Sequence, residues 1–285
     1  MAEISAADVK RLREKTGAGM MECKNALVET GGDFDKAEKL LKEKGLAALE
    51  KRAGRATNEG KVFVKIKDDG SAAVLAELAS ETDFVARNPE FIALGNAIAD
   101  KALAAGCTEP NDELNGMVAE LATKIRENMS LKRLKTVTAN SGEYLASYIH
   151  GEGNIGIVVK CASDKPEIFK DADVKAFVFS LALHIAAFNP YALDRSKIDP
   201  TYISEQEDIF RKLMEKDEKL QGKPANVLDG ILKGKINKHL AEICLLDQGY
   251  VKDEKLTVAQ ALAEHGKKAG GAISIVDYVY FKVGA

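Results

Sequence analysis

Glycines spaced for phosphate binding are the first feature of this sequence that could carry chemistry. Residues 151–156 read G-x-G-x-x-G, and Asp171 follows about twenty residues later, which is the spacing of a dinucleotide-binding fingerprint. That fingerprint requires a helix directly after the glycines, because the helix N-terminus binds the pyrophosphate. Residues 155–159 are instead rich in β-branched side chains, so we interpret the glycines as a hairpin turn. An oxidoreductase that binds NAD or NADP there is the alternative.

A second group of residues suited to chemistry is Thr82-Asp83-Phe84-Val85, in which an aromatic ring stands beside a carboxylate. It lies directly after a predicted β-hairpin. From the pattern alone, Thr82 or Asp83 caps a short turn and Phe84 folds into the core. The alternative is that the ring and the carboxylate protrude and contact a partner.

Side chains that commonly hold metals or carry covalent catalysis are scattered through the sequence. The four cysteines form no C-x-x-C pair, and the four histidines lie far apart. The P-loop, zinc-protease and serine-hydrolase motifs are absent from the sequence. We therefore expect reduced thiols, no metal site, no cofactor and no covalent catalysis.

Composition limits the class of protein. The chain has 285 residues, more than a usual single domain, so we expect two or more compact units. Its 41 basic and 44 acidic residues nearly balance, which argues against direct binding of nucleic acid. The first residues lack a basic region followed by an apolar stretch, and the apolar run of residues 174–188 is too short to span a bilayer. We expect a cytoplasmic protein that does not bind a membrane.

The N-terminal part of the chain is predicted to form a small three-helix unit. Ser5 is expected to cap the first helix, a glycine-rich segment at residues 16–19 ends it, and Asp33 caps the third helix. Met20 and Met21 begin the second helix, where they either fill the core or offer an adaptable protein-binding surface. Apolar periodicity is lost at residues 51–60, so residues 1–55 are predicted to be a separate domain.

The middle of the chain predicts two related α+β units, which we assign to residues 56–140 and 141–285. In the first, strands at residues 62–66 and 72–78 flank an Asp-Gly turn and precede helices that begin at Pro89 and near Leu114. A similar order returns at residues 144–188, as alternating strand, glycine turn, apolar strand and helix. This similarity suggests an internal repeat.

The second unit is predicted to carry an inserted helical hairpin at about residues 201–244. Apolar residues recur along an outgoing and a returning segment on either side of a Gly-Lys-Pro turn, as expected for a coiled coil. The outgoing residues are Ile203, Phe210, Leu213 and Leu220. A last helix at residues 256–265 and a closing strand at 272–283 follow, which completes an α+β fold.

Several segments resemble the elongation factor Ts family. Residues 12–27 read LREKTGAGMMECKNAL and are similar to the N-terminal signature of that family, and Thr82-Asp83-Phe84-Val85 is similar to its second signature. Further similarity lies in residues 125–128, 147–151, 184–187 and 222–224. The order and spacing of these segments agree over nearly the whole chain.

The resemblance implies a function and an architecture. The fold would be a ubiquitin-associated-like three-helix domain, a core of two related α+β subdomains and a coiled-coil insertion. The protein would be a guanine nucleotide exchange factor that binds elongation factor Tu in its GDP-bound and nucleotide-free states. Asp83 and Phe84 would enter the G domain of that partner beside its magnesium ion and promote GDP release.

The resemblance also implies further partner contacts and one departure. Arg13, Met20 and Met21 would contact the G domain from the N-terminal unit, and His150 and His184 would contribute from the second core unit. Family members often continue into a C-terminal helical module, and we expect its contact to be missing here. The sequence leaves homodimerisation open, and a scaffold that binds without exchange activity is a further alternative.

Overall fold

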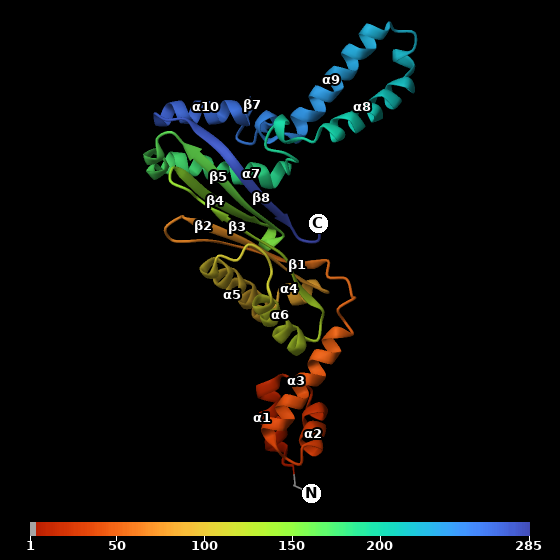
Figure 1. Cartoon of the computed structure of the whole chain (residues 1–285), viewed down its shortest axis with the longest axis vertical. Helices are drawn as coiled ribbons and strands as arrows, with labels where there is room; N and C mark the ends of the chain where they lie inside the picture. Colours follow the sequence, from red (N-terminus) through yellow and green to blue (C-terminus); the bar gives the residue numbers. More distant parts are fainter. Residues whose placement is uncertain (1–3) are drawn as a thin grey trace.

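The computed structural model describes residues 4–285. Residues 1–3 are part of the N-terminal segment that lacks a basic region followed by an apolar stretch, and they lie outside the described residues. It combines helices with antiparallel sheets, which confirms the predicted α+β class. Figure 1 shows an elongated molecule in which the N-terminal helices lie at one end and a helical hairpin protrudes from the other.

Local capping explains the three N-terminal helices. They are α1 Ala6–Thr16, α2 Met20–Glu29 and α3 Phe34–Glu50. As predicted, Ser5 accepts the Asp8 N–H at 3.1 Å and Asp33 accepts the Lys36 N–H at 3.0 Å, so both helices begin with a satisfied donor. Gly17 ends α1 with φ 69°, a left-handed conformation that favours glycine. The helices share a small core of their own around Leu12, Cys23 and Leu27.

The first sheet has the order β1-β2-β3, with all neighbours antiparallel. Its strands are β1 Glu59–Ile66, β2 Ala72–Ser80 and β3 Met129–Thr138, and its helices are α4 Asp83–Ala86, α5 Pro89–Ala105 and α6 Asp112–Ile125. The central strand β2 is buried along its whole length. The helices α5 and α6 cover one face through an apolar cluster that includes Leu78, Phe91 and Leu114.

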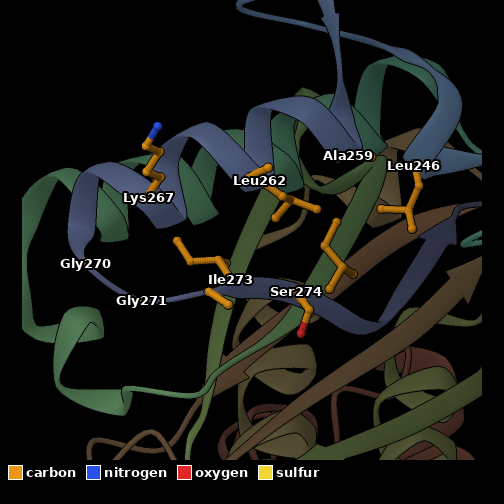
Figure 2. Close-up of a pocket in the computed structure, with 11 residues that line it drawn as sticks. Leu246, Ala259, Leu262, Lys267, Gly270, Gly271, Ile273 and Ser274 are labelled. Carbon is orange, nitrogen blue, oxygen red and sulfur yellow. The ribbon is translucent and has the colours of Figure 1, made fainter.

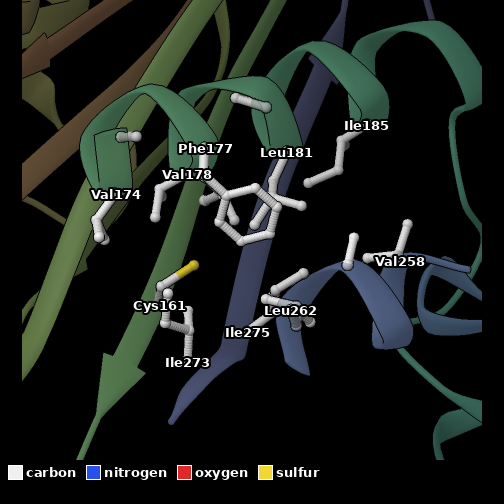
Figure 3. Close-up of a cluster of buried hydrophobic side chains, with 14 of the residues drawn as sticks. Cys161, Val174, Phe177, Val178, Leu181, Ile185, Val258, Leu262, Ile273 and Ile275 are labelled. Carbon is white, nitrogen blue, oxygen red and sulfur yellow. The ribbon is translucent and has the colours of Figure 1, made fainter. Parts of the chain in front are cut away.

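The second sheet has the order β4-β5-β8 and repeats this plan. Its strands are β4 Glu143–His150, β5 Ile155–Ser163 and β8 Ile273–Lys282, and the helices α7 Ala172–Phe188 and α10 Val258–Ala269 cover its outer face. Figure 3 shows the side chains of Phe177, Leu181 and Ile275 meeting between α7, α10 and the strands. Both sheets also have a register shift opposite the central strand, at Glu77 and at Lys160. The two sheets therefore share the same arrangement of three antiparallel strands, while the internal repeat stays a prediction.

The two sheets pack face to face between the helical layers. Val62 and Leu75 of the first sheet meet Val158 and Phe281 of the second in one buried cluster. Gly156 of β5 allows the close approach, because a Cβ atom there would lie 2.4 Å from Val62 Cγ1. The result is a helix–sheet–sheet–helix sandwich.

The helical hairpin is formed by α8 Pro200–Glu215 and α9 Ala225–Ile243, which agrees with the predicted insertion. One detail of the prediction was wrong. The side chain of Leu213 is 56% exposed, whereas Met214 is 8% exposed and packs on α9. The outgoing helix ends at Glu215, and Asp217 caps a separate short turn that carries Leu220 back to the seam.

Some elements were not predicted. The strand β3 was not predicted, because the register shift at Glu77 interrupts its alternation of buried and exposed residues. As a result Leu131 and Leu134, three residues apart, are both buried. The short strands β6 Gly249–Tyr250 and β7 Asp253–Thr257 have no clear apolar pattern. Five 3-10 segments complete the described elements: η1 Gly151–Gly153, η2 Pro166–Lys170, η3 Arg195–Lys197, η4 Glu218–Leu220 and η5 Leu245–Asp247.

The division into domains stays a prediction, although the clusters are consistent with it. The N-terminal helices, each sheet with its helices and the hairpin all have separate buried cores. Within residues 4–285, none of the helices has the length and apolar character needed to cross a membrane.

Candidate functional site

The loop after β2 presents one aromatic ring to solvent. Thr82 caps the short helix α4 by accepting the Val85 N–H at 3.4 Å. Val85 and Ala86 turn inward and join the core beneath α5, and Phe84 is left 81% exposed. The structure therefore contradicts the inward orientation that the pattern alone predicted for Phe84, and it makes Val85 an anchor of the loop.

Asp83 adds a carboxylate next to this ring. It lies 3.3 Å from the guanidinium of Arg87 one turn later, and both side chains are substantially exposed. An exposed pair of this kind contributes little to stability and can be exchanged for another partner without a large cost. The exposed apolar ring and the adjacent carboxylate form a protruding feature suited to binding.

Two carboxylates, one from the segment after α6 and one from the loop itself, hold the base of this loop. Glu127, just beyond α6, accepts the Thr82 N–H at 3.1 Å and the Thr82 hydroxyl at 2.8 Å. Glu81 accepts the Asn128 N–H at 2.6 Å and lies 3.3 Å from Arg55. The Asn128 backbone hydrogen bond is the main cause that lowers the pKa of Glu81, and Arg55 adds to it. Charge-assisted hydrogen bonds to the two carboxylates thus fix the base of the loop.

The N-terminal candidates form a second exposed group. Arg13 is exposed on α1, and Met20 and Met21 are 42% and 64% exposed at the start of α2. Of the two interpretations of the methionines, the structure favours a surface role. Glu22 of α2 pairs with Arg126, next to the residue that holds Thr82. The structure therefore links the two candidate surfaces through neighbouring residues of one turn.

The two predicted histidines lie in different environments. His150 is exposed at the end of β4, with its Nδ1 3.0 Å from the hydroxyl of Tyr148. His184 is fully buried, where its Nε2 lies 3.0 Å from Gln248 Oε1 and its Nδ1 accepts the Val251 N–H at 3.2 Å. A direct partner contact through His184 is therefore not available in this structure. Its hydrogen bonds instead tie α7 to the base of the hairpin.

The G-x-G-x-x-G segment has structural reasons for its glycines. It forms the η1 turn between β4 and β5, as the hairpin interpretation predicted, and no helix follows it. Gly151 and Gly153 have φ 58° and 105°, and Gly156 faces the other sheet. Phosphate binding at a helix N-terminus has no basis here. The oxidoreductase alternative loses its supporting observation.

A pocket between α10 and β8 offers no acid–base chemistry. Figure 2 shows Leu246, Leu262 and Ile273 lining it beside the glycine turn that follows α10. Lys267 is the single ionisable side chain among its described lining residues. A lone, exposed lysine is not a catalytic arrangement. We therefore place the candidate functional site at the α4 loop.

Comparisons with known proteins point to one family. A family model described as "Elongation factor TS" matches residues 81–285. Proteins named elongation factor Ts are 50% identical in Treponema denticola and 47% identical in Treponema pallidum strain Nichols, each over 99% of both chains. A Borrelia hermsii protein of the same name is 40% identical over 99% of both chains.

The chain belongs to the elongation factor Ts family. Members of the elongation factor Ts family take part in translation elongation, and this chain is a translation elongation factor on that ground. The region that the family model matches begins at Glu81, directly before the candidate site. The relatives extend the similarity over the N-terminal helices as well.

Sequence reasoning missed the residues that support the site. Residues 125–128 are similar to the family, but the sequence alone indicates no role for Arg126, Glu127 or Asn128. Glu127 and Thr82 are 45 positions apart in sequence, so no local pattern predicts their contact. A charged segment directly after a helix was the one available signal.

Proposed function

We propose that this protein is a guanine nucleotide exchange factor for elongation factor Tu. It binds the GDP-bound partner, promotes release of GDP and leaves the site free for GTP. The observation that carries the proposal is Phe84, an 81% exposed ring on a loop whose base is firmly hydrogen-bonded. Membership of the elongation factor Ts family supports the choice of partner.

The proposed mechanism is displacement by volume and charge. Phe84 enters the G domain beside the magnesium ion and moves the groups that hold the metal. Magnesium neutralises phosphate charge, so weakening its coordination weakens the binding of GDP. Asp83, already next to Phe84, brings a negative charge to the same place or pairs with a cation of the partner.

Thermodynamic linkage defines the activity. A factor that binds the nucleotide-free partner more tightly than the GDP-bound partner must weaken the binding of GDP to that partner by the same ratio. No bond is made or broken, so we propose a binding factor and not an enzyme of covalent chemistry. The free energy for release comes from the contacts made by the protruding loop and its neighbouring surfaces.

Additional surfaces are proposed to supply affinity. The N-terminal helices, which we propose to be a ubiquitin-associated-like domain, present Arg13, Met20 and Met21. Methionine side chains adapt to irregular surfaces, which suits a partner that changes conformation. His150 and Tyr148 at the exposed end of β4 offer a further polar and aromatic contact.

The test is the release rate of a fluorescent GDP analogue from purified elongation factor Tu, measured by stopped flow. We expect strong acceleration by the wild-type protein and loss of most of it with Phe84→Ala. Val276→Ala is the matched control, because it also removes exposed apolar surface (39% exposed) but lies on β8. Binding of Tu without acceleration by the wild type would leave only a scaffold role.

A further inference from the structure

One turn of the chain contacts three separate parts of the molecule. The residues Arg126, Glu127 and Asn128 connect α6 to β3, and we refer to them as the clasp. Their partners are Glu22 of α2, Thr82 of the α4 loop and the carbonyl groups of Ala53 and Arg55. Consecutive residues thereby join the N-terminal helices, the segment that follows them and the candidate site.

Glu127 is the member that touches the α4 loop. Its carboxylate accepts both polar hydrogens of Thr82, from the backbone N–H and from the hydroxyl. The hydroxyl oxygen of Thr82 in turn accepts the Val85 N–H, which begins α4. The direction of α4, and therefore of Phe84, depends on these successive hydrogen bonds between Glu127 and Thr82 and between Thr82 and Val85. A carboxylate that accepts two hydrogen bonds from one residue restrains it more strongly than a single neutral bond would.

Arg126 has a backbone that signals a constraint. It ends α6 with φ 69°, a left-handed conformation that is unfavourable for a residue with a Cβ atom, and glycine is the usual residue at such a position. Its guanidinium pairs with Glu22, which also accepts the Gly19 N–H at the start of α2. The exposed pair sets the position of the methionine-bearing end of α2 and contributes little to overall stability.

We propose that the clasp is a positioning device for nucleotide exchange: Glu127 aims Phe84, and Arg126 holds the Met20–Met21 surface at a fixed place relative to it. This inference rests on the proposed exchange function. Neither residue needs to touch the partner, since each acts through the residue it holds. Glu127 therefore affects the maximal rate of GDP release, and Arg126 affects the concentration of factor needed to reach half of it.

The first experiment separates a positioning role from a structural one. Glu127→Ala is expected to lower the maximal acceleration on the order of tenfold, since it removes hydrogen bonds to a charged group. In the Phe84→Ala background the same change should have almost no further effect, because there is no ring left to aim. Glu127→Gln, which keeps one acceptor oxygen, should recover part of the rate. Glu120→Ala, which removes an exposed carboxylate from α6, the helix that precedes Glu127, is the control.

A second readout does not depend on the partner. Hydrogen exchange of the Val85–Arg87 amides should accelerate in Glu127→Ala and in Glu127→Gln, while the amides of α5 stay protected. Equal hydrogen-exchange rates of these amides in the wild type and all variants would overturn the role of Glu127. Fully additive effects of Glu127→Ala and Phe84→Ala on the rate of GDP release would overturn it as well. Failure of the wild type to accelerate GDP release would instead refute the proposed function. The hydrogen-exchange rates of the Val85–Arg87 amides would still show whether Glu127 orders the loop.

The third measurement addresses Arg126. Arg126→Gly relieves the left-handed backbone and removes the guanidinium, so the melting temperature should be unchanged or higher. The half-saturating concentration should rise severalfold at an unchanged maximal rate. Glu22→Gln should reproduce this effect, and the two changes together should be no worse than one. An unchanged half-saturating concentration in both variants would refute the proposal for Arg126.

Discussion

Phe84 shows how a single side chain can be available for binding without serving the fold. Its ring is 81% exposed, while its neighbours Val85 and Ala86 are in the core. Burying a ring of this size would contribute about 1.5–3 kcal/mol, and the fold forgoes that gain.

We therefore predict that Phe84→Ala leaves the free energy of unfolding within about 0.5 kcal/mol of wild type. The reason is that the substitution removes no core contact. Denaturant unfolding followed by circular dichroism is the measurement. Val85→Ala is the contrasting variant, because it removes buried atoms and should be clearly destabilising. A large loss of stability in Phe84→Ala would mean that the ring packs on the protein in solution.

Gly156 provides a prediction about the contact between the sheets. A Cβ atom there would come within 2.4 Å of Val62 Cγ1, in a buried place with little room for adjustment. Gly156→Ala should therefore lower the free energy of unfolding by about 1–3 kcal/mol. Gly230→Ala on the exposed surface of α9 is the matched control and should raise it by about 0.5–1 kcal/mol. Equal effects of the two substitutions would argue against close packing of the sheets.

Residue-level predictions from the sequence succeeded where the signal was local. The capping roles of Ser5 and Asp33 depend on residues three positions away, and the structure confirms both. The burial of His184 could not be read from its own helix, since it depends on Gln248, 64 positions later. The outward direction of Phe84 is likewise fixed by the distant Glu127.

At the scale of elements, the helices and strands with a regular apolar periodicity were predicted. An element whose periodicity is interrupted was missed. The hairpins and the long helices have clean patterns, and they were found. The strand β3 was missed because its register shift places two buried leucines three residues apart, a spacing that resembles a helix. The choice of Leu213 for the hairpin seam has another cause, because Leu213 and Met214 follow Phe210 by three and four residues and both spacings fit one face of a helix.

Those two adjacent residues of α8 give a direct test of the hairpin packing. Met214→Ala should destabilise the contact with α9 by about 2 kcal/mol, because it removes a buried side chain, whereas Leu213→Ala should stay within about 0.5 kcal/mol. Hydrogen exchange of the α8 and α9 amides measures the local effect. Faster exchange in Leu213→Ala than in Met214→Ala would reverse the assignment of the seam.

The junction of α7 with the base of the hairpin should respond to pH through His184. Burial is the main cause that lowers the pKa of His184, and the hydrogen bond to Gln248 opposes it. The unfolded chain protonates this side chain near the ordinary value of 6.5, before the folded protein does. The stabilisation from neutral His184 is therefore complete above pH 6.5. It is lost as the pH falls from there through the lowered pKa that His184 has in the folded protein.

We expect the melting temperature of the wild type to decrease between pH 7.5 and 5.5. The melting temperature of His184→Asn should decrease less over the same interval. His265, whose pKa is also lowered mainly by burial, contributes in the same direction. His150→Asn, at an exposed position, is the control and should follow the wild type. An identical pH dependence in His184→Asn and wild type would exclude His184 as a source of the effect.

At the scale of the whole molecule, the N-terminal helices and the hairpin are each built around a core of their own. The three N-terminal helices have their own apolar cluster, and α3 reaches the first sheet unit through Leu49 and through close packing of Gly45 on Thr123. The hairpin at the other end is likewise built around its own cluster. Such a molecule can present several surfaces to one partner while each unit folds around its own core.

This arrangement predicts that affinity and exchange can be separated by truncation. A fragment of residues 51–285 keeps Phe84, Glu127 and the carbonyl groups of Ala53 and Arg55 that Asn128 binds. It loses Met20, Met21 and the partner of Arg126. It should therefore fold, reach nearly the full maximal rate of GDP release and require a concentration at least tenfold higher, since a lost contact worth about 1.4 kcal/mol changes affinity by that factor.

Titration of the fragment against elongation factor Tu in the stopped-flow assay gives both quantities in one experiment. Circular dichroism of the fragment confirms that the sheets are intact, and the fragment carrying Phe84→Ala shows whether the remaining rate still depends on the ring. A normal half-saturating concentration would mean that the N-terminal helices do not contact the partner. A lost maximal rate in a folded fragment would mean that those helices are needed to aim Phe84, so that positioning extends from the clasp to the whole N-terminal unit.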